Sequence, residues 1–134
     1  MSTHATSSFD VTGWDGAAYD EPSNGPHLSR VTICKAFRGD LEGESVGEGL
    51  FCGANDPGAG AGYVVSERVT GSLGGRSGTF VLQHGGLAAP GMTPHSFGSI
   101  VPGSGTGELV GLRGEVTFSA EGGAHTLTLD YSFV

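Results

Sequence analysis

Residues 62–87, GYVVSERVTGSLGGRSGTFVLQHGGL, give the clearest indication of how this chain folds. Two runs of alternating polar and apolar residues, 62–73 and 77–87, flank Gly74 and Gly75, a pair typical of a two-residue hairpin turn. Alternation with a period of two is the pattern of a strand that buries one face. The stretch therefore predicts an antiparallel β-hairpin with one face turned toward a core.

The apolar face of this hairpin carries two ionisable residues, Glu67 and His84. A two-residue turn pairs Glu67 with Leu82 and Val65 with His84, which makes the acid and the imidazole diagonal neighbours about 7–8 Å apart. A four-residue loop would pair them directly. A loop of odd length would place them on opposite faces, but it would also oppose apolar residues to polar ones. We therefore expect Glu67 and His84 to point inward together, with Arg68 and Gln83 outside.

The rest of the chain repeats the strand pattern and shows no amphipathic helix. Turn signals rich in glycine and proline separate the strands, and 105–114 can form one helical turn. The fold class predicted is all-β, a single antiparallel barrel or sandwich of eight strands over 8–134 that follows a flexible tail over 1–7. The expected strands are 8–14, 28–38, 44–52, 62–73, 77–87, 95–102, 114–121 and 124–133.

Composition and net charge limit the partners and the compartment that we expect for this protein. The chain has 134 residues, of which 26 are glycine, and its formal net charge is −8. An acidic chain without a basic stripe is not expected to bind nucleic acid or an anionic membrane surface. The N-terminus has neither a basic region nor an apolar one, so we expect a cytoplasmic protein.

The two cysteines are consistent with a cytoplasmic protein. Cys34 and Cys52 fall on neighbouring strands, about four residues apart along the ladder, and at about 3.3 Å per residue this is too far for a disulfide. We expect both thiols to be free.

Other motifs have plainer explanations than chemistry. PGSGTGEL (102–109) lacks the Gly-Lys-Ser/Thr ending of a phosphate loop, so a turn explains it better. Glu67, His84 and His95 could meet around a metal if their strands are close, but no histidine has metal-site spacing, and we expect no metal and no cofactor. No Gly-x-Ser-x-Gly motif opens a helix, which argues against a hydrolase with a Ser-His-Asp triad.

Two long motifs carry a family resemblance. ERVTGSLGGRSGTFVLQHGG (67–86) and IVPGSGTGELVGLRGEVTF (100–118) resemble the bacterial DUF3224 family of uncharacterised proteins. The resemblance implies an eight-stranded barrel like that of allene oxide cyclases, commonly oligomeric and with an internal cavity. The wider superfamily includes dirigent proteins and cyclases of polyketide pathways, but the resemblance implies no particular activity.

Two functions are consistent with these residues. In the first, the barrel is a cyclase or isomerase that folds an apolar, polyketide- or terpenoid-like substrate, with Glu67 and His84 moving a proton. In the second, it binds or carries a small hydrophobic molecule without chemistry. The pair could instead be a buried polar contact that only sets the strand register. The residues expected to line the substrate site are Tyr63, Val65, Phe80, Leu82, Trp14 and Tyr131.

Two further expectations concern surfaces. Trp14 and the loop over 14–26 could cover one mouth of the barrel, or could be a plain surface connection. On the outside, apolar residues such as Val64, Val81, Phe97 and Val101 would be left for another subunit to cover, so we expect a homo-oligomer, a dimer or trimer.

Overall fold

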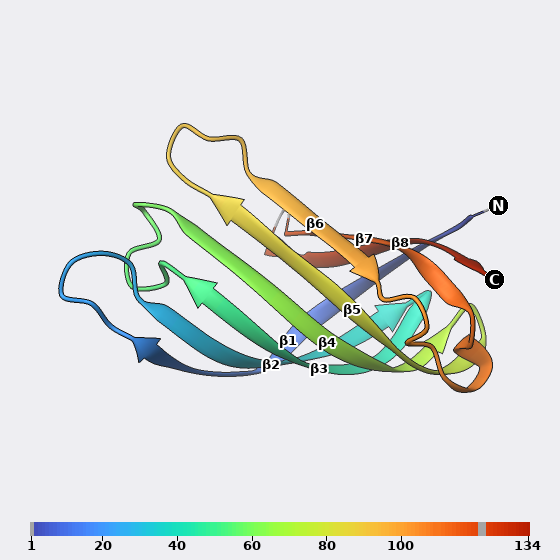
Figure 1. Cartoon of the computed structure of the whole chain (residues 1–134). Coiled ribbons are helices and arrows are strands. Elements are labelled where there is room, and N and C mark those ends of the chain that lie inside the picture. Colours follow the sequence, from blue (N-terminus) through green and yellow to red (C-terminus); the bar gives the residue numbers. More distant parts are fainter. Residues whose placement is uncertain (1, 121–122) are drawn as a thin grey trace.

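Eight antiparallel strands close into a ring in the computed structural model, which describes residues 2–120 and 123–134 (Figure 1). The strands pair in chain order, and β1 closes the ring by pairing with β8. One short helix, the 3₁₀ turn η1, falls within the helical turn expected over 105–114. The elements are β1 (Thr3–Asp20), β2 (Leu28–Gly39), β3 (Leu41–Cys52), β4 (Ala61–Leu73), β5 (Arg76–Ala88), β6 (His95–Ile100), η1 (Gly107–Leu109), β7 (Leu112–Ser119) and β8 (His125–Phe133).

The hairpin of β4 and β5 has the register that the sequence predicts. Glu67 pairs with Leu82 and Val65 with His84, around a turn of Gly74 and Gly75 that both have positive φ. Glu67 and His84 are buried, while Arg68 and Gln83 are exposed. The predicted inward orientation of the pair is therefore confirmed.

The first strand is longer than expected, and the predicted flexible tail over 1–7 is wrong for the residues described. Thr3 to Phe9 pair with β8, and Ala5 and Ser7 are each 2% exposed. The hydroxyl of Ser7 donates to the carbonyl oxygen of Leu41 at 3.0 Å and accepts from the Leu41 amide at 2.8 Å. These residues are needed because the ring cannot close without a partner for β8.

Other boundaries differ by a few residues, as strand ends commonly do. The expected strand over 114–121 is β7, which begins at Leu112 and ends at Ser119; Glu121 and Gly122 lie outside the described residues. The cysteines are free, as predicted, although Cys34 pairs with Val46 and so lies six rather than four positions from Cys52. In the described part of the chain, no helix is long and apolar enough to cross a membrane.

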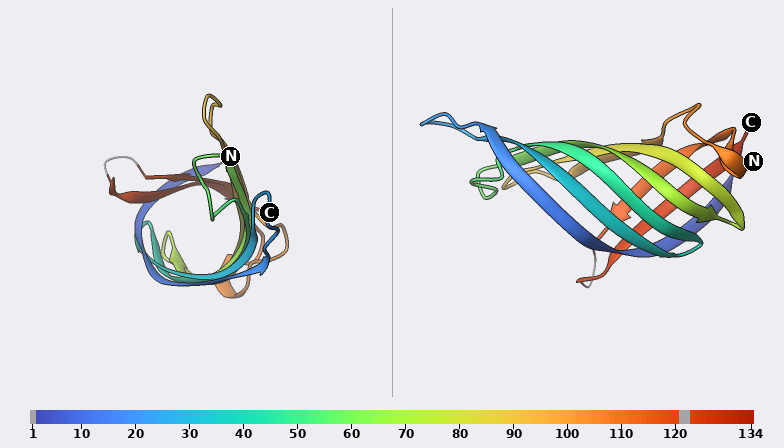
Figure 2. Two further views of the ribbon diagram at one scale, coloured as in Figure 1. Left: turned by 90° about the vertical axis from the view of Figure 1, so that its left-hand side faces the viewer. Right: turned by 90° about the horizontal axis from the view of Figure 1, so that it is seen from below.

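The two ends of the ring differ in the length of their loops and in how completely their strands pair. The short β2–β3 and β4–β5 turns lie at the end that carries both termini, and the longer β1–β2, β3–β4 and β5–β6 loops lie at the opposite end, seen face-on in the left view of Figure 2. Beyond Phe9, the described residues of β1 pair with β2 alone, and β6 pairs with β7 only at Ser99 and Ile100. The loop-bearing end is therefore incompletely closed on the side of β6, β7 and β1.

The interior consists of two apolar clusters. The larger one fills the end that carries the termini and includes Phe80, Leu82 and Leu129. The smaller one, toward the long loops, consists of Val31, Ile33 and Val65 with the half-buried Phe51 and Tyr63 packed against it. Glu67 follows Val65 and precedes Val69 on the inner face of β4, so a polar layer separates the two clusters.

Close backbone contact between β3 and β4 gives a test of this packing. A Cβ atom at Gly71 would lie 2.0 Å from the carbonyl oxygen of Glu42, which is backbone and has no room to move. We expect Gly71→Ala to lower the free energy of unfolding by about 1–3 kcal/mol, the usual cost of overpacking. Gly58→Ala is the control, because a Cβ there has no neighbour closer than 3.8 Å. Equal urea midpoints for the two variants would contradict the predicted packing.

Candidate functional site

The site is built around the carboxylate of Glu67, which points into the barrel from β4. Gly47 stands opposite it on β3, and a Cβ atom at that position would lie 2.7 Å from the Cβ of Glu67. Glycine at this position therefore leaves the carboxyl group the space it occupies. The side chain of Glu67 is 2% exposed, so its polar atoms depend on partners within the protein.

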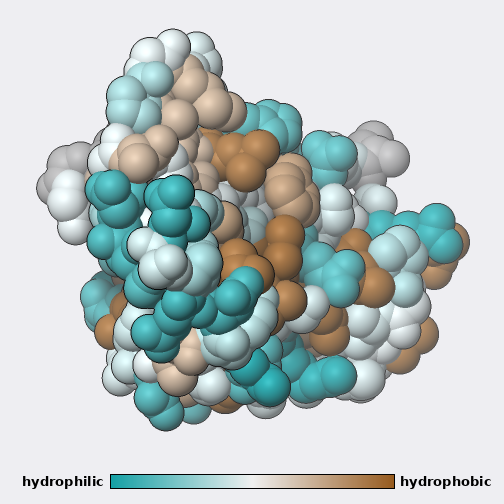
Figure 3. Space-filling view, turned by 60° about the vertical axis from the view of Figure 1, so that its left-hand side comes forward, coloured by the Kyte–Doolittle hydropathy of each residue, from teal (hydrophilic) through white to brown (hydrophobic). Residues whose placement is uncertain are grey.

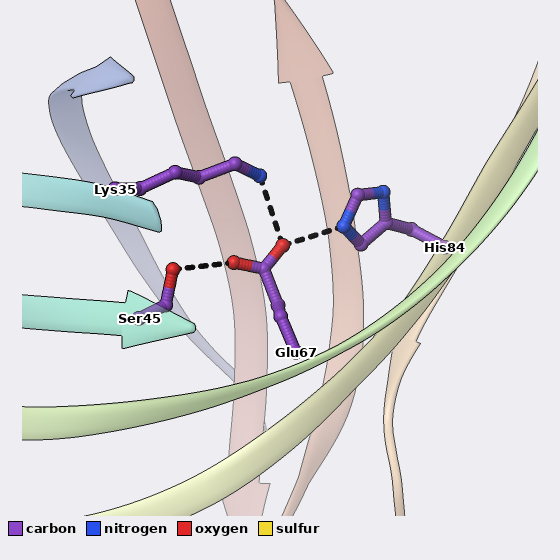
Figure 4. A network of polar contacts seen from close by, with 4 residues as sticks. All are labelled: Lys35, Ser45, Glu67 and His84. Atoms are coloured by element: carbon purple, nitrogen blue, oxygen red, sulfur yellow. Dashed lines mark hydrogen bonds and ion pairs between the residues drawn. The ribbon is translucent and has the colours of Figure 1, made fainter. Parts of the chain in front are cut away.

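Three side chains from three strands supply those partners (Figure 4). Lys35 Nζ of β2 donates to Oε1 at 2.9 Å, and Ser45 Oγ of β3 donates to Oε2 at 2.6 Å. His84 Nε2 of β5 lies 2.5 Å from the same Oε1 that binds the lysine. Lys35, Ser45 and His84 are all buried, and we call these four residues the carboxylate network.

This arrangement determines the charge of Glu67. Burial by itself would raise its pKa, but the hydrogen bond from His84, the charge and hydrogen bond of Lys35 and the hydrogen bond from Ser45 together lower the pKa to about 2. Glu67 is therefore ionised at neutral pH. An ionised carboxylate only accepts hydrogen bonds, so Nε2 of His84 must carry the proton in their contact.

The other ring nitrogen of His84 is the unsatisfied atom of the site. Nδ1 is buried and has no hydrogen-bond partner among the described residues. It lies on a part of the ring that does not face the carboxylate (Figure 4). Because buried polar atoms are nearly always paired, an orphan of this kind points to a missing partner.

Lys35 is a site residue that the sequence indicated without identifying. It is the only lysine of the chain, and it interrupts the apolar face of β2 between Ile33 and Phe37. Its ammonium group lies 4.4 Å from the ring centroid of Phe118 and 5.1 Å from that of Phe9, so aromatic faces as well as Glu67 stabilise the charge. The sequence marks Ser45 only as a residue on the inner face of its strand.

A series of aromatic contacts joins the network to the mouth of the barrel. The ring centroids lie 5.4 Å apart for Trp14 and Phe51, 5.2 Å for Phe51 and Tyr63, and 6.2 Å for Tyr63 and His84. The imidazole is in turn 4.4 Å from Phe118. Exposure falls along this aromatic series from 61% at Trp14 to 5% at His84.

A bulge in β1 brings Trp14 onto the inner face. Strict alternation from Val11 would turn Gly13 inward and Trp14 outward. The register shifts between Val11 and Gly13, and Trp14 pairs with Ile33, whose side chain is buried inside the ring. Trp14 therefore lies on the inner face near the mouth, although it remains largely exposed. The loop expected over 14–26 is wrong for residues 14–20, because they continue β1 and pair with β2.

A pocket of about 510 Å³ lies at the mouth. Phe51, Tyr63 and Ala88 of the strands line it together with the loops that follow β3 and β5, and its wall is mostly apolar. Figure 3 shows apolar side chains gathered on the surface near this end. Tyr63 contacts both the pocket and His84, and is therefore the link between them.

The residues predicted to form the site are only partly brought together. Glu67, His84, Val65 and Tyr63 are neighbours, and Trp14 lies at the mouth. Phe80, Leu82 and Tyr131, however, belong to the larger cluster at the other end of the barrel, where Phe80 and Leu82 are fully buried. Alternation along a strand identifies the inner face but not how deep in the barrel a residue lies. It therefore cannot separate these three core residues from the residues of the site.

His95 does not join the carboxylate network. It lines the mouth pocket, whereas His84 contacts Glu67. Among residues 2–120 and 123–134, no group of three or more histidine, cysteine, aspartate or glutamate side chains could hold a metal ion. The geometry gives no support to a site built from Glu67, His84 and His95.

The comparisons with known proteins agree with this fold. Residues 5–131 match the family described as "Protein of unknown function (DUF3224)". The chain belongs to the DUF3224 family. A crystal structure of a protein with unknown function from this family, from Shewanella oneidensis MR-1, is similar to this chain with 40% sequence identity and a TM-score of 0.87, covering 100% of this chain and 99% of that chain. No curated protein matches the chain.

The buried carboxylate gives a stability prediction for this DUF3224 protein. Glu67→Gln leaves the Lys35 ammonium group in the core without its anion, and we expect a loss of about 3 kcal/mol in the free energy of unfolding. The control is Glu48→Gln, since the exposed Glu48 also accepts from two side chains, Arg30 and Thr32. Its substitution should cost much less, because solvent screens the charge of an exposed carboxylate. Equal losses would contradict the network.

The comparison of wild type with Glu67→Gln also gives a prediction about pH. Glu67 has a pKa of about 2 in the folded chain against an ordinary value of 4.5, so the unfolded chain takes up this proton more readily. The stabilisation by ionised Glu67 is complete above its ordinary pKa and is lost as the pH falls toward 2. We therefore expect the stability difference between wild type and Glu67→Gln, measured by urea unfolding, to shrink over that acidic range. A constant difference would contradict the assigned charge.

Proposed function

We propose that this protein binds a small hydrophobic molecule at the mouth of its barrel and acts on it as a cyclase or isomerase. The observation that carries this proposal is the contact of Tyr63 with both an apolar pocket of about 510 Å³ and an imidazole whose second nitrogen is free. A pocket of this volume is in the range that holds small molecules.

The network suggests how the proton would move. Nδ1 of His84 takes a proton from the bound molecule and later returns it at another position, so that the electron pair of the broken C–H bond is redistributed within the substrate. The reaction is an isomerisation with no net change in atoms, and it needs no cofactor. Glu67 stays ionised and acts as a positioning residue that holds Nε2, while Lys35 balances its charge.

The apolar wall would supply the rest of the catalysis. A flexible molecule held against Phe51 and Tyr63 is restricted to few conformations, and water is displaced from the mouth. Catalysis of this kind needs a shaped surface and few polar groups, which suits a lumen that contains a single polar layer.

Non-catalytic binding or transport of a hydrophobic molecule is the second candidate. It is favoured by the fact that neither Glu67 nor His84 is part of the wall of the mouth pocket. In this alternative, Tyr63 separates the ligand from the network, and the carboxylate network only stabilises the barrel.

A ligand screen separates these functions. We expect polyketide- and terpenoid-like compounds to raise the melting temperature of the wild type, and Phe51→Ser to weaken that shift because it removes an aromatic wall.

For a compound that binds, the products formed by wild type and by His84→Ala are compared to decide between isomerase and carrier. Loss of product with retained binding supports the isomerase, and binding without product from either protein supports the carrier. His4→Ala, an exposed histidine at the other end, is the control. No shift with any apolar compound would contradict both.

Self-association is part of the proposal. The outer sheet face near the mouth carries Leu50, Val64, Leu87 and Phe97, each about half exposed, whereas Val81 and Val101 are partly buried. Contiguous apolar residues on an outer face are typical of a surface that another chain covers.

Light scattering at micromolar concentration tests this. We expect a mass of at least a dimer for the wild type and a smaller mass for Phe97→Ser, because a hydroxyl replaces a ring on that face. Val110→Ser, an equally apolar and exposed position near η1, should leave the mass unchanged. A monomeric wild type would contradict the proposal.

A further inference from the structure

The state of His84 restricts the chemistry of the ligand. Lys35 and Glu67 already form a neutral pair, since the ammonium group lies 2.9 Å from the carboxylate. A second positive charge on the imidazole would leave this buried cluster with a net charge, which is costly away from water. His84 therefore fits best as a neutral imidazole with its proton on Nε2, where the carboxylate accepts it.

This tautomer makes Nδ1 an acceptor. A neutral imidazole with a proton on Nε2 has a lone pair on Nδ1 and can only accept a hydrogen bond there. The ring is 5% exposed, and Nδ1 has no partner among the described residues. Water and a ligand hydroxyl group are the donors that could satisfy it.

The surroundings of the ring are apolar and aromatic. Phe118 lies 4.4 Å from the imidazole and Tyr63 packs edge-on at 6.2 Å, with Phe51 stacked on the far side of Tyr63. Tyr63 lines the mouth pocket and contacts the imidazole, so the Tyr63 side of the ring is the approach from that pocket. The body of a ligand that reaches Nδ1 must then be apolar and its donor must lie at one end.

We propose that the ligand of this site is an apolar, ring-containing molecule with a hydroxyl group, phenolic or enolic, that donates a hydrogen bond to Nδ1 of His84. This inference rests on the proposed binding function and specifies its ligand class. Apolar molecules without a donor, or with an ether in its place, leave Nδ1 unpaired and bind more weakly.

Three probes of the same shape test the donor. Naphthalene has no polar atom, 2-methoxynaphthalene can only accept, and 2-naphthol can donate. We expect 2-naphthol to bind the wild type roughly tenfold more tightly than the other two, the effect of one net hydrogen bond. Equal affinity for all three would overturn the inference but leave the proposed binding function standing. No binding of any probe would overturn both.

Two variants locate the hydrogen bond. His84→Phe keeps a ring but removes the nitrogen, so the preference for 2-naphthol should disappear while naphthalene still binds. His4→Phe, at an exposed histidine of the other end, is the control and should keep the preference. His95→Phe tests the alternative acceptor, because His95 is an exposed histidine of the mouth pocket. If His95→Phe and not His84→Phe removes the preference, the hydroxyl group binds at the mouth and the inference is wrong.

A measurement on the wild type covers the case in which His84→Phe does not fold. Titration with 2-naphthol should shift the nitrogen NMR signal of His84 Nδ1, and 2-methoxynaphthalene at equal occupancy should shift it much less. An unchanged Nδ1 signal at saturation with 2-naphthol would overturn the inference.

Discussion

The ionised carboxylate of Glu67 constrains the whole barrel. A carboxylate that is 2% exposed has lost its hydration and is tolerated only because Lys35, Ser45 and His84 replace it. Each partner comes from a different strand, so the network joins β2, β3, β4 and β5 through side chains as well as through the backbone ladder. A change in register of one of these strands would leave the charge unpaired, which gives the network a role in specificity as well as in stability.

The same network divides the interior into two parts with different uses. On one side, residues such as Phe80 and Leu129 fill the barrel completely and provide its stability. On the other side, Val31, Ile33 and Val65 form a smaller cluster, and the strands around them are incompletely paired. The second end is the one at which we propose that a ligand binds, because its strands are less completely paired and the main core lies at the other end.

Glycine shapes that second end. A Cβ at Gly49 would lie 2.6 Å from the ring of Phe51, and one at Gly86 would lie 3.2 Å from the ring of Tyr63. Both rings can therefore lie close against the inner surface of the sheet. This accounts for an aromatic series that leads from the surface to His84, and it explains in part why a chain of 134 residues contains 26 glycines.

The strand pattern, the register of the central hairpin and the inward orientation of Glu67 and His84 could all be predicted from the sequence, because alternation and turn length are local properties of the chain. Lys35 was also visible there as an exception on an apolar face. That Lys35 and Ser45 reach the same carboxylate could not be predicted, since it depends on the order in which strands join around a ring. The depth of a residue in the barrel could not be predicted either. Leu82 and His84 share one face of β5, yet Leu82 belongs to the larger apolar cluster and His84 contacts Tyr63. The bulge that turns Trp14 inward and the pairing of residues 3–9 with β8 also required the closed ring, because both depend on partners far away in the sequence.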